Sequence, residues 1–567
     1  MNKLIIKYLA ICCLVLLVQS KLNAQLGNTK YGNEAGISIT TADSCTMVGE
    51  GAGRSTTLGS FNTFLGAMAG QANSSGNDNT YIGFRAGSSG TSASNNTIIG
   101  TRAGMNITNS SSSDNVFIGT EAGRETTTGG DNVFIGDNAG RYNTTGRANV
   151  FIGDQTGISN TEADDNTFIG RQAGQANTTG ICNTFIGAAN DGNDNISSNE
   201  LAAGYFHTTG SFNTLMGNGA GARSLDANGN TLIGYICGFN TRYADECTMV
   251  GAFAGWENNR TNSETDANRN TYVGYEAGFT NRIGEDNVGI GTYADFQQTG
   301  SGSRNYRTVF IGANAQVDGN DVIAVGYDAD GDATNAIAIG NKSFVDNNYS
   351  IAIGQNATAT QVQSIAIGAE SNVTGSNAVA IGYQAVCPGH NEVHFGNSAV
   401  TSIGGSVNWT ATSDGRFKKD VREDVPGLDF INRLHPVTYN FDSRKLHEYQ
   451  QGCTESLETA FQQKENTRYT GFIAQEVEEA AKASKYDFSG VDTPTSENDV
   501  YGLRYAEFSV PMVKAIQELD EKVKSQEERI EQLLAKIKTQ QEHIGALTKA
   551  HKPVKPNNSP LYSANKK

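Results

Sequence analysis

The sequence has little proline, little positive charge and few histidines, and each shortage argues against a class of protein. Only 8 of its 567 residues are proline although 66 are glycine, and no Gly-X-Y period is present. A proline-rich disordered linker and a collagen-like chain are therefore excluded. Lys and Arg number 42 against 59 Asp and Glu, which gives a formal net charge of −17. The chain therefore lacks the clustered positive charge with which a nucleic-acid-binding protein neutralises phosphates. The seven histidines are scattered without the spacing of metal ligands, so we expect no metal and no other cofactor.

Long apolar runs are absent after the first residues, so no later segment is expected to span a membrane. Residues 1–24 differ from the rest of the chain. Lys3 and Lys7 come before an apolar stretch at 8–18, and Leu22-Asn23-Ala24 ends the segment. This order is typical of a secretory signal peptide that is cleaved after Ala24. We expect export through the inner membrane, to the cell surface or the extracellular space.

Cysteines are few and irregularly spaced in the remaining chain. None forms a Cys-x-x-Cys pair, and the six positions are Cys45, Cys182, Cys237, Cys247, Cys387 and Cys453. This spacing indicates tolerated small residues more than it indicates a disulfide framework.

Glycine marks a repeat that fills most of the chain. A phrase such as Asn115-Val-Phe-Ile-Gly119 recurs over residues 25–306, most often every 17 residues, and the step contracts to 14 over residues 307–400. Each unit offers one strand of about five residues and a glycine turn. Because one such unit cannot bury its own apolar face, the units must stack, which predicts an all-β solenoid with parallel strands.

Both faces of the repeated strand are apolar. Adjacent strand residues such as Phe117 and Ile118 point to opposite faces, so one fills the coil and the other needs cover. Phe and Tyr left in water along the rod would form a sticky patch, which predicts oligomerisation. A wide coil whose insertions cover that face is the alternative. In the 14-residue block Ala338 and Ala352 take the aromatic position, which predicts closer approach at an axis.

The 14-residue phrase Ile337-Ala-Ile-Gly340, repeated as Ile351-Ala-Ile-Gly354, resembles the head repeat of trimeric autotransporter adhesins. The resemblance is good over about 308–400 and looser in the 17-residue block. It implies a left-handed parallel β-roll and a homotrimer. Neither handedness nor the number three follows from the period itself.

Composition changes after Gly396, where glycine becomes rare and Glu, Lys and Leu rise. Residues 401–412 read as a neck that leads to Ser413-Asp-Gly-Arg-Phe-Lys418, and residues 413–510 as a small α+β domain. We expect a strand at 435–441, a helix at about 474–484 and a long helix from near Ala506. Apolar residues at heptad spacing from Ile516 predict a coiled coil over 511–550, followed by a flexible tail at 551–567. The heptads alone do not specify three strands.

The pieces from Ser413 to Leu519 together resemble the intramolecular chaperone domain of phage endosialidases and tail fibres. The resemblance implies that Ser413 is a nucleophile, that Lys418 is its base and that the bond between Thr412 and Ser413 is cut after trimerisation. Arg416 and Lys419 would supply cations that favour a neutral Lys418, and Asp414 would orient the turn. Phe417 replaces the family's usual Leu, and residues 443–468 look like an insertion. Without the resemblance, Ser413-Asp414-Gly415 reads as an ordinary turn beside solvated lysines.

Two functions follow from these features. The first is a secreted or surface trimeric fibre, adhesin-like and with a host-surface or glycan ligand, whose chaperone cleaves itself off as a single-turnover serine peptidase. The alternative is a polysaccharide-degrading fibre matured by the same chaperone. Such an enzyme needs paired carboxylates in a groove, and few Asp or Glu recur in the repeat.

Overall fold

The computed structural model describes residues 27–190, 201–260, 263, 266–297, 305–451, 457–494 and 499–551. The predicted signal peptide at 1–24 and all of the predicted tail except His551 lie outside these residues. The chain divides into two compact units, one ending at Asn397 and the other beginning at Ser398.

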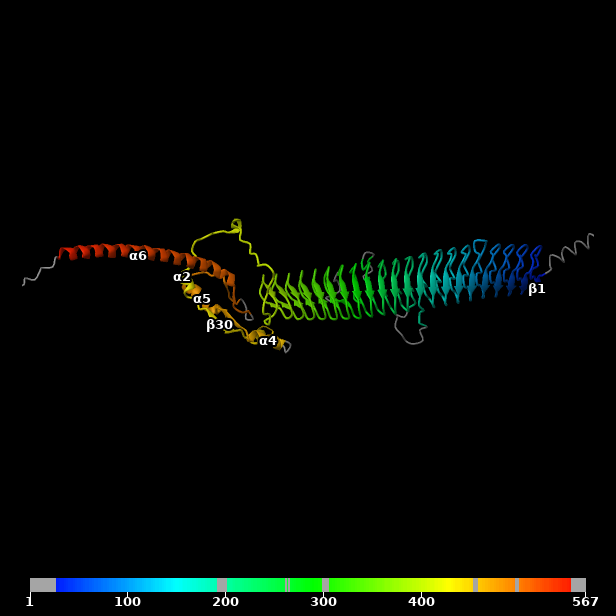
Figure 1. Ribbon diagram of the computed structural model, residues 1–567. Coiled ribbons are helices and arrows are strands. Elements are labelled where there is room, and N and C mark those ends of the chain that lie inside the picture. Colours follow the sequence, from blue (N-terminus) through cyan, green and yellow to red (C-terminus); the bar gives the residue numbers. More distant parts are fainter. Residues whose placement is uncertain are drawn as a thin grey trace, which may run out of the picture. The chain divides into compact units, whose positions relative to one another are not determined.

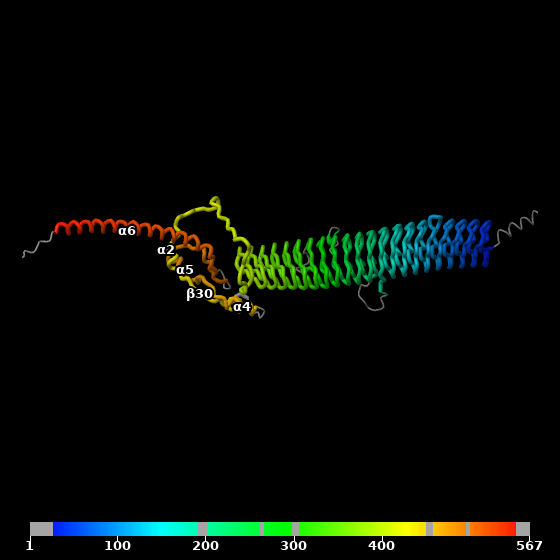
Figure 2. Tube along the Cα trace, in the orientation of Figure 1, coloured from blue at the N-terminus to red at the C-terminus, as the bar shows by residue number. Residues whose placement is uncertain are grey.

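The first unit is a β-solenoid in which one strand from each coil pairs in parallel with the same strand of the next coil (Figures 1 and 2). Pairing is in register throughout, as for Phe117 with Phe134. The strands of this main sheet are β1 (Thr29–Tyr31), β2 (Thr46–Val48), β3 (Thr63–Leu65), β4 (Thr80–Ile82), β5 (Thr97–Ile99), β6 (Val116–Ile118), β7 (Val133–Ile135), β8 (Val150–Ile152), β9 (Thr167–Ile169), β10 (Thr184–Ile186), β11 (Thr214–Met216), β12 (Thr231–Ile233), β13 (Thr248–Val250), β14 (Thr271–Val273), β15 (Val288–Ile290), β17 (Val309–Ile311), β19 (Ile323–Val325), β21 (Ile337–Ile339), β23 (Ile351–Ile353), β25 (Ile365–Ile367), β27 (Val379–Ile381) and β29 (Val393–Phe395).

A second parallel sheet runs beside the 14-residue coils. Its two-residue strands are β16 (Asp295–Phe296), β18 (Gln316–Val317), β20 (Asp330–Gly331), β22 (Phe344–Val345), β24 (Thr358–Ala359), β26 (Asn372–Val373) and β28 (Val386–Cys387). One residue of each short strand is buried, and these residues line the same core as the middle residues of the main sheet.

The coil interior is built from stacked identical side chains. The rings of Phe117, Phe134 and Phe151 are fully buried and stack with centroids 4.9 and 4.8 Å apart. Beside them runs a buried amide ladder, in which Nδ2 of Asn132 donates to Oδ1 of Asn115 at 3.2 Å. Stacking therefore buries apolar surface and satisfies polar groups in the same step.

The closing glycine of each coil is required by backbone geometry. Gly136 has a φ of 141°, and a Cβ there would lie 2.3 Å from the carbonyl oxygen of Gly153 in the next coil. No L-residue fits such a position without strain, which explains why the phrase always ends in glycine.

The structure corrects three expectations about these strands. The strands have three residues at most, not about five, and the aromatic row lies inside the coil, whereas partly exposed residues such as Ile118 form the outer row. Ala338 and Ala352 are also fully buried inside the coil, so the predicted closer approach at an axis is wrong. The smaller side chain fits because residues of the second sheet, such as Val345, share the same interior.

The second unit is a small α/β region followed by one long helix. Its elements are η1 (Gly415–Phe417), α2 (Leu428–Ile431), β30 (Val437–Asn440), α3 (Ser443–Gln451), α4 (Glu458–Glu465), β31 (Arg468–Gly471), α5 (Ala474–Ala483), β32 (Val491–Asp492), β33 (Gly502–Leu503), η3 (Tyr505–Phe508) and α6 (Ser509–Ala550). β30 pairs antiparallel with β31. Phe430, Phe488 and Phe508 form the centre of its core.

Several elements of this unit lie where the sequence analysis expects them, namely the strand β30 and the helices α5 and α6. The segment 443–468, which looks like an insertion in the sequence, contains α3 and α4, and His447 of α3 packs on Phe461 of α4. Among the described residues, no helix has both the length and the apolar character needed to cross a bilayer.

Candidate active site

A single helical turn brings Ser413 and Lys418 together. The short helix η1 lies between them, and the backbone N–H of Lys418 donates to the carbonyl oxygen of Gly415 at 3.2 Å, which folds the chain back on itself. As a result, Nζ of Lys418 donates a hydrogen bond to Oγ of Ser413 at 2.8 Å. This separation lies within the reach that proton transfer between a nucleophile and its base requires.

Asp414 and Arg416 hold the turn in place. Oδ1 of Asp414 accepts from the backbone N–H of Arg416 at 2.9 Å and so caps η1. The Asp414 carboxylate also accepts from Nε and an Nη of the Arg416 guanidinium, and these contacts hold the pKa of Asp414 below its usual range. Asp414 is therefore a turn residue, and the charge of Arg416 is directed to Asp414 and not to Lys418.

The residues around the turn are exposed. Thr412, Ser413, Lys418 and Lys419 all lie on the surface. Large apolar side chains around them are exposed as well: Val407 (85%), Trp409 (83%), Phe417 (76%) and Val421 (78%). Large apolar residues this exposed, close together in the sequence, are typical of a segment that a partner covers.

The exposed stretch is fixed to the rest of the second unit at both ends. On one side, Nζ of Lys464 donates to the backbone carbonyls of Ser398 and Val400 at 2.6 and 2.9 Å, and burial lowers the pKa of Lys464. On the other side, Oε2 of Glu518 in α6 accepts from the backbone N–H of Leu428 at 2.8 Å. Residues 401–426 thus form a strap between two anchors, with the Ser413 turn near its middle.

Gly427 makes the second anchor fit. A Cβ at this position would lie 2.7 Å from the backbone nitrogen of Ala515 in α6. Only glycine therefore lets the chain lie this close to α6.

The sequence analysis missed the residues that anchor the strap. Lys464 lies in the segment that looked like an insertion, and Glu518 lies 90 residues from its partner. Among the residues that anchor the strap, Gly427 alone has a local signal in the sequence, because a glycine directly before a short helix commonly marks a helix boundary.

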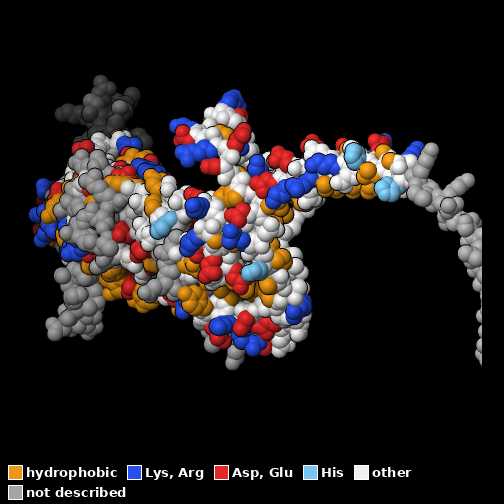
Figure 3. Space-filling model, turned by 90° about the vertical axis from the view of Figure 1, so that its left-hand side faces the viewer, with side chains coloured by type: hydrophobic (Ala, Val, Ile, Leu, Met, Phe, Trp, Pro, Cys, Tyr) orange, Lys and Arg blue, Asp and Glu red, His pale blue; other side chains and the backbone are white. Residues whose placement is uncertain are grey.

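The long helix α6 carries an exposed apolar stripe. Its residues at heptad spacing have exposed fractions between 43% for Val523 and 67% for Ile516, and the stripe continues through Leu519, Ile530, Leu533, Ile537, Ile544 and Leu547. Figure 3 shows hydrophobic side chains exposed along this helix. A stripe of this kind on a surface helix has the pattern of a coiled-coil seam.

Comparison with known proteins finds one match in the repeats of the first unit and another in the second unit. Residues 311–329, 332–357 and 359–385 match the family model of the YadA head domain repeat. Among solved structures, the crystal structure of the collagen-binding domain of the Yersinia adhesin YadA matches 31% of this chain and 75% of its own chain, with 20% identity and a TM-score of 0.18. No curated protein sequence matches. Residues 413–485, which begin at the nucleophile candidate itself, match the Peptidase S74 family, the chaperone of endosialidase.

Proposed function

We propose that the chain is the subunit of a surface fibre, and that its C-terminal module assembles three copies and then cleaves itself off between Thr412 and Ser413. The observation that carries this proposal is the 2.8 Å contact between Lys418 and Ser413 at the first residues of a segment that matches the chaperone of endosialidase. The adhesin head repeats before it supply the fibre.

The cleavage chemistry follows from the positions of the two side chains. Oγ of Ser413 attacks the carbonyl carbon of Thr412, and its proton passes to the neutral amine of Lys418. The bond between that carbon and the Ser413 nitrogen breaks as the nitrogen takes up the proton. Water then hydrolyses the resulting ester, which leaves a carboxylate on Thr412 and a free amine and hydroxyl on Ser413.

Assembly supplies what the single chain lacks. Only a neutral amine can take the serine proton, and Lys418 is exposed in the single chain. Burial favours the neutral form of an amine. A partner chain packed on Trp409, Phe417 and Val421 would bury the turn, and Lys419 would add a neighbouring cation. Cleavage then waits for the fibre to form.

The α6 stripe is the surface through which the copies associate. A coiled coil of three α6 helices would cover the exposed apolar residues. Because Glu518 of α6 anchors one end of the strap, helix association would be linked to the segment that carries the Ser413 turn. Parallel coils fold slowly and expose strand edges, which explains why such a fibre needs a template for its register.

The assembly step is tested with α6 variants. Ile537→Asp should prevent trimer formation and also leave the chain uncut, whereas Glu531→Ala, outside the stripe, should behave as wild type. Molecular mass in solution reports assembly, and denaturing electrophoresis reports cleavage. Full cleavage of a monomeric Ile537→Asp protein would contradict the assembly requirement.

The fibre itself is proposed to be exported by the signal peptide at 1–24 and to act in adhesion, with a host-surface or glycan ligand. In the proposed trimer, the copies cover the outer Ile row of the main sheet. The polar turns of each coil then remain available for binding. Binding of the purified fibre to a glycan array or to host cells tests this role.

One observation favours the polysaccharide-degrading alternative. Tyr293, Asn314, Gln316, Asp328 and Asp330 line a surface hollow of about 400 Å³. Burial, together with the nearby Asp332, raises the pKa of Asp330 to about 7, which suits a general acid. Turnover of a polysaccharide by the wild type, abolished in Asp330→Asn, would establish this function, and binding without turnover would establish the adhesin.

A further inference from the structure

The interior of the solenoid changes character in its last coil. Along the 14-residue repeat, Val373, Ala378 and Ala380 are fully buried apolar residues that line the coil. One step later the register places a different set at these three positions, namely Cys387, Glu392 and His394. Three potential metal ligands thus replace three apolar side chains within a single coil.

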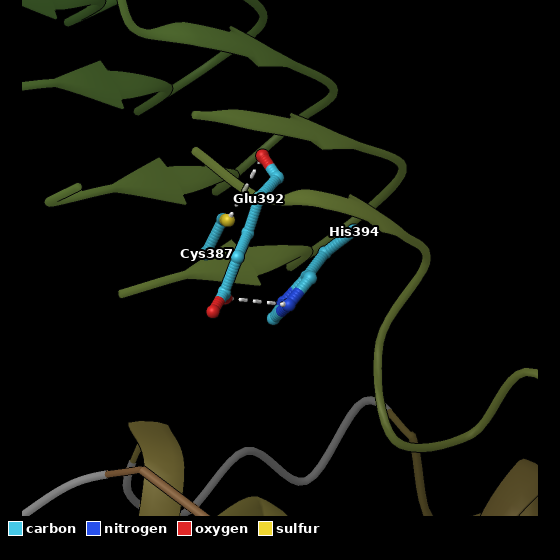
Figure 4. A group of neighbouring side chains, drawn as sticks. All are labelled: Cys387, Glu392 and His394. Carbon is cyan, nitrogen blue, oxygen red and sulfur yellow. Dashed lines mark hydrogen bonds and ion pairs between the residues drawn. The ribbon is translucent and has the colours of Figure 1, made fainter. Parts of the chain in front are cut away.

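The side chains of Glu392 and His394 point toward one another, whereas the sulfur of Cys387 donates to the backbone carbonyl oxygen of Glu392 at 3.6 Å (Figure 4). The sulfur of Cys387, a carboxylate oxygen of Glu392 and a ring nitrogen of His394 all lie within 4.8 Å of each other. Nε2 of His394 is 3.3 Å from Oε2 of Glu392. Two ligands bound to one tetrahedral Zn²⁺ at about 2.0 Å are separated by roughly 3.3 Å, so this pair already has the required spacing.

The hydrogen bond at the other ring nitrogen prepares His394 as a ligand. Nδ1 lies 2.7 Å from the carbonyl oxygen of Val386, and because a carbonyl oxygen only accepts, Nδ1 carries the hydrogen. In the neutral ring, the lone pair of Nε2 then faces the Glu392 carboxylate. In this tautomer the two atoms are both electron-pair donors that can bind one cation. A backbone carbonyl bound to the remote nitrogen is the usual second-shell support of a metal-bound histidine.

Cys387 completes the donor set from inside the coil. It is fully buried, and burial, with the Glu392 charge nearby, raises the pKa of its thiol to about 11. A thiol of this kind is a poor nucleophile, which argues against a Cys-His-Glu catalytic arrangement. A bound metal ion would deprotonate this thiol. Its positive charge would then compensate the buried thiolate and the nearby carboxylate.

We propose that Cys387, Glu392 and His394 bind one Zn²⁺ ion that closes the last coil of the solenoid. Sulfur, nitrogen and carboxylate oxygen together are the donors that Zn²⁺ takes in proteins, and three protein ligands leave the fourth tetrahedral position to water. The expectation of no metal rested on sequence spacing between histidines, and the ligands found here include only one histidine.

The test uses the full-length chain without a histidine tag, freed of metal and titrated with Zn²⁺ and with Co²⁺. Wild type should bind one ion per chain, and the Co²⁺ form should show a thiolate charge-transfer band. Cys387→Val, Glu392→Ala and His394→Ala restore the residue types of the preceding coil, so each is expected to fold. Each should weaken Zn²⁺ binding by at least about tenfold. Cys182→Ser, at a partly exposed thiol in another coil, should leave binding unchanged.

Zn²⁺ should also raise the melting temperature of the wild type and not that of Cys387→Val. A circular dichroism spectrum equal to that of wild type shows that the variant solenoid is folded. Absence of the thiolate band in wild type, or its persistence in Cys387→Val, would overturn the site. In that case Glu392 and His394 form only an ion pair at the solenoid end.

Discussion

Nζ of Lys418 lies 2.8 Å from Oγ of Ser413, and one 3₁₀ turn capped by Asp414 is enough to produce this contact. The two side chains are five residues apart and both exposed, so the contact forms locally and does not depend on the rest of the unit. The serine therefore contacts the lysine before any assembly, and in the proposed cleavage the partner chains need only bury the turn, which favours the neutral lysine.

Lys418 and the adjacent Lys419 provide a matched pair for testing the base. Lys418→Met should reduce the rate of cleavage at least about 100-fold, because the serine loses the group that takes its proton. Lys419→Met keeps the contact and should lower the rate much less. The fraction of cut chain over time, followed by denaturing electrophoresis, gives both rates. An equal loss of cleavage rate in the two variants would show that the total positive charge matters and that Lys418 is not the base.

Asp414 is expected to act through the turn. Asp414→Ala removes the side-chain cap of η1 and should slow cleavage, whereas Asp414→Asn keeps a capping oxygen and should retain most of the rate. Because Arg416 holds the pKa of Asp414 below its usual value, the cap persists as the pH falls and is lost only when the carboxylate is protonated below that range. Cleavage rates of the two variants at neutral pH test this, and an inactive Asp414→Asn would indicate a direct role for the charge.

Gly427 and Gly415 differ in the space around them. A Cβ at Gly427 would meet the backbone of Ala515, whereas nothing lies within 4 Å of one at Gly415. Gly427→Ala should destabilise the second unit by about 1–3 kcal/mol, and Gly415→Ala should have little effect. Thermal unfolding followed by circular dichroism compares them. A stable Gly427→Ala protein would show that the strap is not anchored on α6.

His207 should make the solenoid sensitive to acid. It occupies the place that Asn177 has in the preceding coil, since its Nε2 donates to the carbonyl oxygen of Gly210 at 2.7 Å as Nδ2 of Asn177 does to Gly180. Burial lowers the pKa of His207 to about 4. The unfolded chain therefore binds a proton that the folded chain does not, and stability falls as the pH drops from about 6.5 to about 4.

The loss over this range is roughly 3 kcal/mol, since a tenfold change in a protonation equilibrium corresponds to about 1.4 kcal/mol. His207→Asn restores the residue of the neighbouring coil and should remove this part of the pH dependence. Melting temperatures of both proteins between pH 7 and pH 4 provide the comparison, and parallel curves would contradict the prediction.

The sequence predicted the features that depend on local geometry. Glycines such as Gly136 recur because their φ and their contact with the next coil allow no other residue, so the solenoid can be read directly from the period. The faces of the strand could not be assigned in this way. Phe117 and Ile118 are both apolar, and alternation predicts opposite faces without telling which one is inside.

The candidate site was predictable only in part. Ser413 and Lys418 came from a resemblance, and a turn of five residues brings them together. The contact between Leu428 and Glu518 joins residues 90 positions apart, for which the sequence holds no local signal. Cys387, Glu392 and His394 are visible once the last coil is aligned with the one before it, because each then stands where the preceding coil has a buried apolar residue.

The central claim is tested most directly by the N-terminal residue of the small fragment released from the purified, assembled protein. The account predicts that the wild type splits at one bond, that the C-terminal fragment begins with Ser413, and that Ser413→Ala forms the same assembly with an intact chain. An uncut wild-type assembly, a fragment that begins elsewhere, or cleavage in Ser413→Ala would contradict it.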